Sequence, residues 1–150
     1  MTSLEIDPAA FEGLVRHAER ALPEECCGVL VGRCNEGSTW VRRVLASENA
    51  AARPEVRFEI SPESLLRARE SALDEALEVV GYYHSHPRGP AEPSATDRAD
   101  AWSGVSYVIV SPEGGAAVEV RSWRLSGEGA FAEEEVRVRG AVHKLREDRS

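Results

Sequence analysis

The chain has 150 residues, of which 42% are hydrophobic and 29% are charged, as expected for a soluble globular domain that can bury a core without disulfide bonds. Its net charge of −8 argues against a general nucleic-acid-binding protein, because such proteins need basic surface to neutralise phosphates. No apolar run reaches the roughly 18 residues that cross a bilayer and the N-terminus shows no secretion signal, so we expect a cytoplasmic protein with neither nucleic acid nor membrane as partner.

The first half of the chain mixes strand and helix patterns. Apolar runs predict strands at residues 3–6, 26–33, 39–47 and 57–60. Asp7-Pro8 opens a helix to about residue 21, with apolar side chains at helical spacing. Ser61-Pro62-Glu63 combines an N-cap, a proline at N1 and an acid in the first turn, and predicts a second helix to about residue 77.

The second half is richer in strands, which we predict at residues 78–86, 106–111, 116–125 and 133–139. Pro87 stops the first of them, and a loop then leads to a short helix at about 95–102. The charged tail at about 141–150 is expected to fray. We therefore predict one domain over residues 1–150, of the α/β class, with a mixed β-sheet flanked by helices.

The three cysteines are Cys26, Cys27 and Cys34. An odd number without an export signal points to a reducing cytoplasm and free thiols. Adjacent residues of a strand face opposite ways, so Cys26 and Cys27 cannot easily bind one ion together. We interpret them as small core residues.

Residues 81–97, GYYHSHPRGPAEPSATD, contain the strongest candidate site. Residues i and i+2 of a strand share a face about 6.6 Å apart, so His84 and His86 can converge on one zinc ion. The turn at Pro87 could bring Asp97 back as a third ligand, and three protein ligands with an open position are typical of catalytic zinc.

Two structural interpretations compete with the metal site. A histidine pair often consists of two surface or hydrogen-bonded side chains. Ser94-x-x-Asp97 also matches a helix capping box, with Ser94 at the N-cap and Asp97 at N3. The capping box and the metal site are compatible, because a helix start is a rigid position from which to direct a carboxylate.

A catalytic zinc site also needs a base, and the candidates are Glu24 and Glu25. Both lie where the first predicted helix gives way to the buried strand CCGVLVG. Most glutamates are exposed loop acids. Spacing alone does not choose between the two, nor does it bring either one to His84.

Four segments together resemble the JAMM (MPN-plus) metallopeptidase family: PEECCGVLVG (23–32), GYYHSHP (81–87), PSATD (93–97) and YVIVS (107–111). The family pattern is an upstream glutamate, then H-[ST]-H-P, six residues and S-x-x-D, and every position is filled. The resemblance implies that the zinc ligands are His84, His86 and Asp97, that Glu25 is the catalytic carboxylate, and that Ser94 supports the tetrahedral intermediate. It also implies a cytidine-deaminase-like arrangement, with a mixed sheet between helices.

The chain looks like the compact prokaryotic form of this family, because little room for an insertion remains between Asp97 and Tyr107. The resemblance implies a zinc-dependent peptidase or isopeptidase that cuts after the C-terminal Gly-Gly of a small ubiquitin-like or sulfur-carrier protein of the ThiS/MoaD type. General removal of ubiquitin-like modifiers from lysines is the second substrate class. A glycine tail could lie along a strand edge, and the aromatic side chains of Tyr82, Tyr83 and Trp102 either line its approach or pack in the core.

Three other readings use the same residues. A zinc deaminase expects H-x-E with P-C-x-x-C, but residue 86 is histidine and the cysteine pair is absent from the sequence. A non-catalytic MPN scaffold would keep the fold and act as a protein-interaction module. A purely structural metal would need a fourth protein ligand, for which Cys27 is the nearest candidate.

Overall fold

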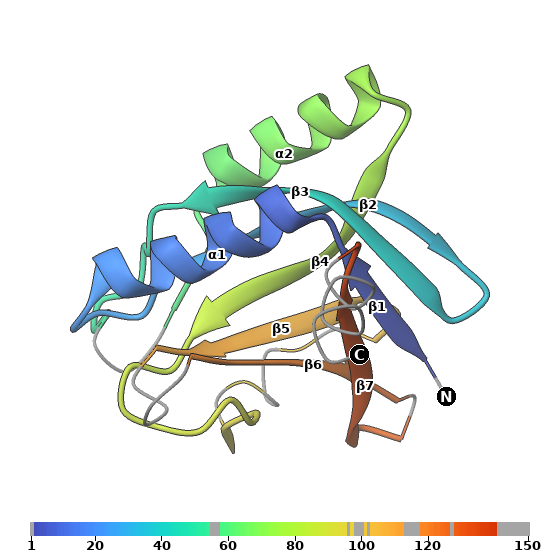
Figure 1. Ribbon diagram of the computed structural model, residues 1–150. Coiled ribbons are helices and arrows are strands. Elements are labelled where there is room, and N and C mark those ends of the chain that lie inside the picture. Colours follow the sequence, from blue (N-terminus) through green and yellow to red (C-terminus); the bar gives the residue numbers. More distant parts are fainter. Residues whose placement is uncertain are drawn as a thin grey trace.

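The computed structural model describes residues 2–54, 58–95, 97, 101, 103–112, 118–126 and 128–140. Within them a single sheet and two helices form the fold (Figure 1). The strands are β1 (Ser3–Ile6), β2 (Cys27–Asn35), β3 (Ser38–Ser47), β4 (Glu78–Ser85), β5 (Ser106–Ser111), β6 (Glu119–Leu125) and β7 (Phe131–Val138). The helices are α1 (Pro8–Ala21) and α2 (Pro62–Asp74). Neither of these described helices is long and apolar enough to span a membrane.

The sheet runs in the order β1-β3-β2-β4-β5-β6-β7 and closes into a barrel, because β1 pairs with both β3 and β7. The pairs β1–β3, β1–β7 and β4–β5 are parallel, and the other pairs are antiparallel. The predicted mixed sheet with helices is therefore confirmed. The closure of the sheet by β1 was not predicted, since no local pattern in residues 3–6 reveals which strands they will join.

The two helices cover opposite faces of β2 (Figure 1). Leu30 joins the larger core cluster, in which Leu14 and Ala18 of α1 pack against side chains from the other strands. Its neighbours Val29 and Val31 face the other way and pack with Ala68 and Ala72 of α2. This alternation is the period-two pattern of a strand that is buried on both faces.

The predicted bounds of β1, α1 and β5 agree with the structure. The strand predicted at 26–33 continues to Asn35, and the chain then turns at Glu36-Gly37, whose φ values are 47° and 83°. The helix predicted to reach residue 77 ends at Asp74, because Ala76 adopts a φ of 57° and the Leu77 N–H bonds to the Ala72 carbonyl.

The strand predicted at 57–60 is wrong for its described part. Residues 58–60 form only an isolated bridge between Asn49 and Ile60, and residue 57 lies outside the described residues. The reason is local, because the Asn49 side-chain oxygen accepts the N–H groups of Ala51 and Glu59 at 3.1 and 3.0 Å. A side-chain amide thus takes the place of a strand ladder.

The remaining differences concern the ends of elements. The strand β4 ends at Ser85, so His86 stands just beyond it, and β7 begins at Phe131 instead of residue 133. In the helix predicted at 95–102, Ala95 and Asp97 are helical, and most of its other residues lie outside the described part, as do residues 116–117 of the predicted 116–125 strand and the tail at 141–150.

Candidate metal centre

The centre lies where β4 ends beside the beginning of β2. In the antiparallel register of these strands Cys27 is opposite His84. Ser85, which is fully buried, accepts the Cys26 N–H with its hydroxyl oxygen at 2.8 Å and donates its own N–H to the Cys26 carbonyl at 3.1 Å. These two bonds fasten the segment that carries Glu25 to the segment that carries both histidines.

Two histidines and one aspartate point at a common centre. The Nε2 atoms of His84 and His86 are 3.1 Å apart, and the Asp97 Oδ2 atom lies 3.2 Å from the first and 3.1 Å from the second. Ligands at 2.0–2.1 Å from a tetrahedral zinc would be about 3.3–3.4 Å apart. The three atoms therefore form a triangle of nearly the size that a zinc ion requires.

The orientation of His86 is fixed from its other ring nitrogen. Its Nδ1–H donates to the Pro90 carbonyl at 2.9 Å, which leaves Nε2 as the nitrogen with the free electron pair. The loop that supplies this carbonyl is itself held, because the Ser111 hydroxyl donates to the Gly89 carbonyl at 2.7 Å and the Trp123 indole donates to the Ala91 carbonyl at 3.0 Å.

His84 is held by packing. It is only 1% exposed, and the Phe58 ring stacks on the imidazole with centroids 4.2 Å apart and planes 15° from parallel. Its Nδ1 atom has no hydrogen-bond partner among the residues that the structure describes. The stacked phenyl ring and the barrel wall thus leave Nε2 as the polar atom that faces the centre.

Ser94 and Asp97 form the predicted capping box. The Ser94 N–H donates to Asp97 Oδ2 at 2.9 Å, and the Asp97 N–H donates to the Ser94 hydroxyl oxygen at 3.1 Å. Asp97 Oδ2 is the same oxygen that faces both histidines. The helix start and the candidate ligand set therefore share one carboxylate, as the compatible interpretation expected.

Glu25 lies at the edge of this triangle. One carboxylate oxygen of Glu25 and one ring nitrogen each of His84 and His86 all lie within 4.8 Å of one another. The residue is 8% exposed, its N–H donates to the Pro54 carbonyl and its carbonyl accepts from the Asn49 side chain at 2.9 Å. Of the two adjacent glutamates, the structure turns Glu25 inward, while Glu24 is exposed.

The surroundings of these four side chains shift the pKa of each one. Burial raises the pKa of Glu25 to about 7, with Asp97 adding to the rise and His86 opposing it. Burial lowers the pKa of His84. Burial alone would lower the pKa of His86, but Asp97, the Pro90 carbonyl and Glu25 outweigh it and raise the pKa. Burial is likewise outweighed at Asp97, because the two neighbouring histidines hold the pKa of its carboxyl well below the ordinary range.

Cys27, the candidate for a fourth ligand, lies outside the centre. Its sulfur contacts the carbonyls of Glu48 and Glu59 at 3.7 and 3.8 Å, and burial raises its thiol pKa to about 12, so it is not arranged as a fourth ligand.

The aromatic residues considered for the substrate approach differ in their burial. Tyr83 is 1% exposed and belongs to the α1 core, so it packs in the core and does not line the substrate approach. Tyr82 is partly buried among the α2-side residues, and Trp102 lies outside the described residues.

Three further residues support the site, although no role was predicted for them from the sequence: Asn49, Phe58 and Ser85. Asn49 organises the segment between β3 and α2 and binds the Glu25 carbonyl. Phe58 falls within the strand predicted at 57–60, but in the structure its ring stacks on His84. Ser85 was visible between the two histidines, but only the pairing of β2 with β4 gives its hydroxyl the Cys26 N–H as a partner.

Comparison with known proteins places this geometry in a family. Residues 7–126 match the family described as prokaryotic homologs of the JAB domain. The chain is 42% identical to a desampylase of Haloferax volcanii, over 76% of this chain and 86% of that protein. It is 39% identical to a CysO-cysteine peptidase of Mycobacterium tuberculosis, over 83% of this chain and 84% of that protein.

Two solved structures share the fold of this chain. A protein of Desulfitobacterium hafniense shares the fold with a TM-score of 0.82 and 30% identity, over 91% of this chain and 92% of that one. A protein of Salinibacter ruber matches with a TM-score of 0.69 and 33% identity, over the same shares of the two chains. The motif resemblance, the domain match and the relatives lead to one conclusion: this chain belongs to the prokaryotic JAB-domain family, the JAMM/MPN type expected from its sequence.

Proposed function

We propose that the protein is a zinc-dependent peptidase or isopeptidase that hydrolyses the bond after the C-terminal Gly-Gly of a small ubiquitin-like or sulfur-carrier protein. The observation that carries the proposal is the triangle of His84, His86 and Asp97, whose ligand atoms lie 3.1–3.2 Å apart, with the buried carboxylate of Glu25 beside it. A site of three ligands with an adjacent base is the arrangement of hydrolytic zinc enzymes.

The donor set supports zinc as the metal. Two imidazole nitrogens and one carboxylate are ligands that zinc accepts, and the bond from His86 Nδ1 to the Pro90 carbonyl prepares its Nε2 for coordination. His84, His86 and Asp97 would hold the ion. When bound, zinc supplies a Lewis acid that lowers the pKa of a coordinated water from 15.7 to about 7.

Glu25 would act as the general base and then as the general acid. It would take a proton from the attacking water and return that proton to the leaving amine, a role typically worth about 10²–10⁴-fold in rate. Its low exposure and its pKa of about 7 support this role, because a group that both accepts and donates works best near the operating pH.

Ser94 would donate its hydroxyl proton to the oxyanion of the tetrahedral intermediate. Its oxygen already accepts the Asp97 N–H at 3.1 Å, which leaves the hydroxyl proton available. Loss of one oxyanion donor typically costs about 10²–10³-fold in rate. The capping bond supports the proposal because it ties the donor to the residue that would bind the metal.

The substrate class is supported by the names of the relatives. They include desampylases, a CysO-cysteine peptidase and, at 33% identity over 71% of this chain and 77% of the relative, a probable TtuB-protein conjugate cleaving protease of Thermus thermophilus. We transfer the shared element of these activities to this chain, namely cleavage at the C-terminus of a small carrier or modifier protein.

The test is to incubate the zinc-loaded protein with a sulfur-carrier protein that has a C-terminal extension after Gly-Gly. Mass spectrometry is expected to show a product that ends in Gly-Gly. The variant His86→Ala is expected to lose both zinc, by elemental analysis, and activity. Bound zinc without hydrolysis of any Gly-Gly fusion would contradict the proposal and favour a non-catalytic scaffold.

We also propose that the layers follow the cytidine-deaminase-like arrangement, which the mixed sheet between α1 and α2 supports. The cytoplasmic location and the single domain over residues 1–150 remain predictions from the sequence.

A further inference from the structure

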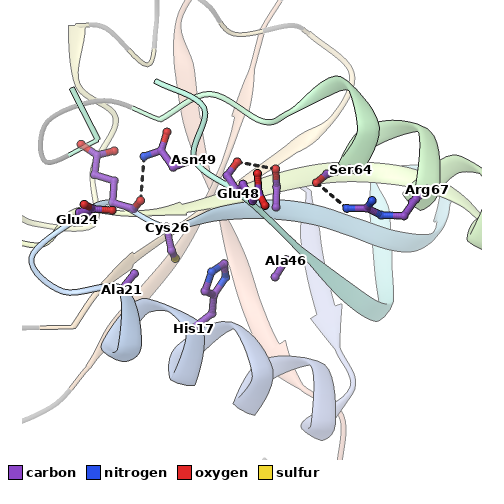
Figure 2. Close-up of a pocket in the computed structure, with 11 residues that line it drawn as sticks. His17, Ala21, Glu24, Cys26, Ala46, Glu48, Asn49, Ser64 and Arg67 are labelled. Carbon is purple, nitrogen blue, oxygen red and sulfur yellow. Dashed lines mark hydrogen bonds between the residues drawn. The ribbon is translucent and has the colours of Figure 1, made fainter. Parts of the chain in front are cut away.

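A groove of about 380 Å³ is lined by Glu25 and by residues of α1, the end of β3 and α2 (Figure 2). It runs past the end of β3 at Ala46 and Ser47 and reaches Ser64 and Arg67 on α2. In Figure 2, Glu24 and Asn49 lie at one end, Arg67 lies at the other, and His17 rises from α1 between them. The two candidate ligand histidines do not line it, so the groove adjoins the reaction centre on its Glu25 side.

The position of Glu25 indicates which part of a substrate this groove would hold. In the proposed reaction Glu25 gives its proton to the nitrogen of the bond that breaks. That nitrogen must therefore lie against the Glu25 carboxylate. Since Glu25 also lines the groove, the groove is the adjacent space into which the leaving segment, the atoms that follow this nitrogen, would continue.

The charges along the groove are unequal. Glu24, Glu25 and Glu48 line it together with one arginine, Arg67. Burial and the nearby Arg20 lower the pKa of His17, which disfavours a second positive charge in the groove. Arg67 is thus the one arginine or lysine among the lining residues, which also include His17, Asn49 and small side chains.

Arg67 also lacks a carboxylate partner in the described part of the chain. Its side chain donates to the Ser64 hydroxyl at 3.3 Å. Arg43, which is near the same helix, is instead paired with Glu75 at 3.0 Å. A guanidinium that faces a groove with its charge unpaired is suited to bind a carboxylate.

We propose that this groove receives the leaving segment of the substrate and that Arg67 binds a carboxylate in that segment. The inference rests on the proposed function and narrows its substrate class. It favours a leaving segment that ends in a free carboxylate, such as an amino acid or a short peptide, over a lysine in the middle of a large folded protein. Arg67 is then a specificity-determining residue for the leaving side.

The experiment uses a sulfur-carrier protein extended after Gly-Gly by one to four residues. Each extension is prepared by semisynthesis in two forms, with a C-terminal carboxylate and with a C-terminal carboxamide. For at least one length, the zinc-loaded protein is expected to cleave the carboxylate form with about fivefold higher kcat/KM, through KM, as for an ion pair with an exposed arginine. The ratio of the two forms is the measured quantity, so a general loss of activity does not affect it.

Arg67→Gln is expected to bring this ratio to one, and Arg67→Lys to retain most of it. The matched control is Arg69→Gln, an exposed arginine of the same helix that does not line the groove, and it should keep the full ratio. Equal cleavage of both forms at every length, or a ratio that survives in Arg67→Gln, would overturn the inference while leaving the proposed function intact. Cleavage of none of the substrates would overturn the proposed function and the inference together.

Discussion

Burial gives Glu25 properties that an exposed glutamate lacks. The side chain is 8% exposed, and its pKa is raised from 4.5 to about 7 mainly by desolvation. Its neighbour Glu24 is exposed to solvent. The two adjacent side chains are chemically identical, but the backbone of Glu25 is held on both sides. Its N–H donates to the Pro54 carbonyl and its carbonyl accepts from the Asn49 side chain, which fixes the direction in which Glu25 points.

Replacement of Glu25 by glutamine is expected to separate metal binding from catalysis. Glu25→Gln keeps the three candidate ligands, so zinc content by elemental analysis should stay near one per chain. The rate kcat should fall by about 10²–10⁴-fold, because the amide cannot carry the proton. The control Glu19→Gln, on the exposed side of α1, should retain activity. Near-normal turnover in Glu25→Gln would eliminate this residue as the base.

The raised pKa of Glu25 also predicts a pH dependence of stability in the metal-free protein. The folded protein binds this proton more tightly than the unfolded chain does, so its stabilising contribution is complete below pH 4.5 and is lost as the pH rises through about 7. The unfolding free energy of the wild type, relative to that of Glu25→Gln, should therefore decrease over this interval. Denaturant unfolding at several pH values measures the difference, and a pH-independent difference would show that Glu25 titrates normally.

At the scale of the elements, the site depends on close contact between β2 and β4. Gly28 lies opposite Tyr83, and a Cβ atom at Gly28 would stand only 2.2 Å from the tyrosine ring. The ring is buried, and its hydroxyl bonds to His17 at 2.8 Å. The glycine therefore gives the space in which Tyr83 fills the core while its neighbour His84 faces the centre.

Gly28→Ala is expected to destabilise the protein by about 1–3 kcal/mol, the usual cost of overpacking a core. The added methyl group must displace either the ring or β2, which would also move Glu25 relative to His84. The melting temperature and the zinc affinity should both decrease. Gly89→Ala is the matched control, because a Cβ atom there meets nothing within 4 Å, and it should be nearly neutral. Equal stability of the two variants would show that the core accommodates a methyl group at Gly28 without loss of unfolding free energy.

At the scale of the whole molecule, the barrel and its two helices form a frame that is independent of the metal. The core clusters on the α1 and α2 faces are formed by hydrophobic side chains of the helices and strands. The far side of the barrel has its own polar connection, in which the buried Glu134 of β7 accepts hydroxyl groups from Ser106 and Ser122 at 2.6 Å each. The metal centre lies at one end of a structure that packing already holds.

Removal of zinc by a chelator should therefore lower the melting temperature without unfolding the protein. A ligand present at about 1,000 times its dissociation constant stabilises the folded state by about 4.1 kcal/mol, and the chelator removes this contribution. Circular dichroism should show an unchanged spectrum at 25 °C and an earlier thermal transition. His86→Ala should show no chelator effect. A metal-free protein that is unfolded at 25 °C would indicate that zinc is required for the fold.

The sequence by itself determined the local features. Period-two and helical patterns predicted most strands and both long helices, because local hydrophobic periodicity follows from the geometry of each element. The i, i+2 spacing placed His84 and His86 on one face, and the Ser94-x-x-Asp97 spacing predicted the capping box, whose bonds the structure contains. The choice of Glu25 over Glu24 came only from the family resemblance.

The tertiary structure decided what depends on contacts between distant segments. The pairing of β1 with β7 closes the barrel, and the pairing of β2 with β4 brings Glu25 to His84 and gives Ser85 its partner. Asn49, Phe58 and the groove that ends at Arg67 likewise exist only once α2 and the segment before it are folded against the sheet. These relations have no local pattern, because strand order and packing are set by the burial of the whole core and not by neighbours along the chain.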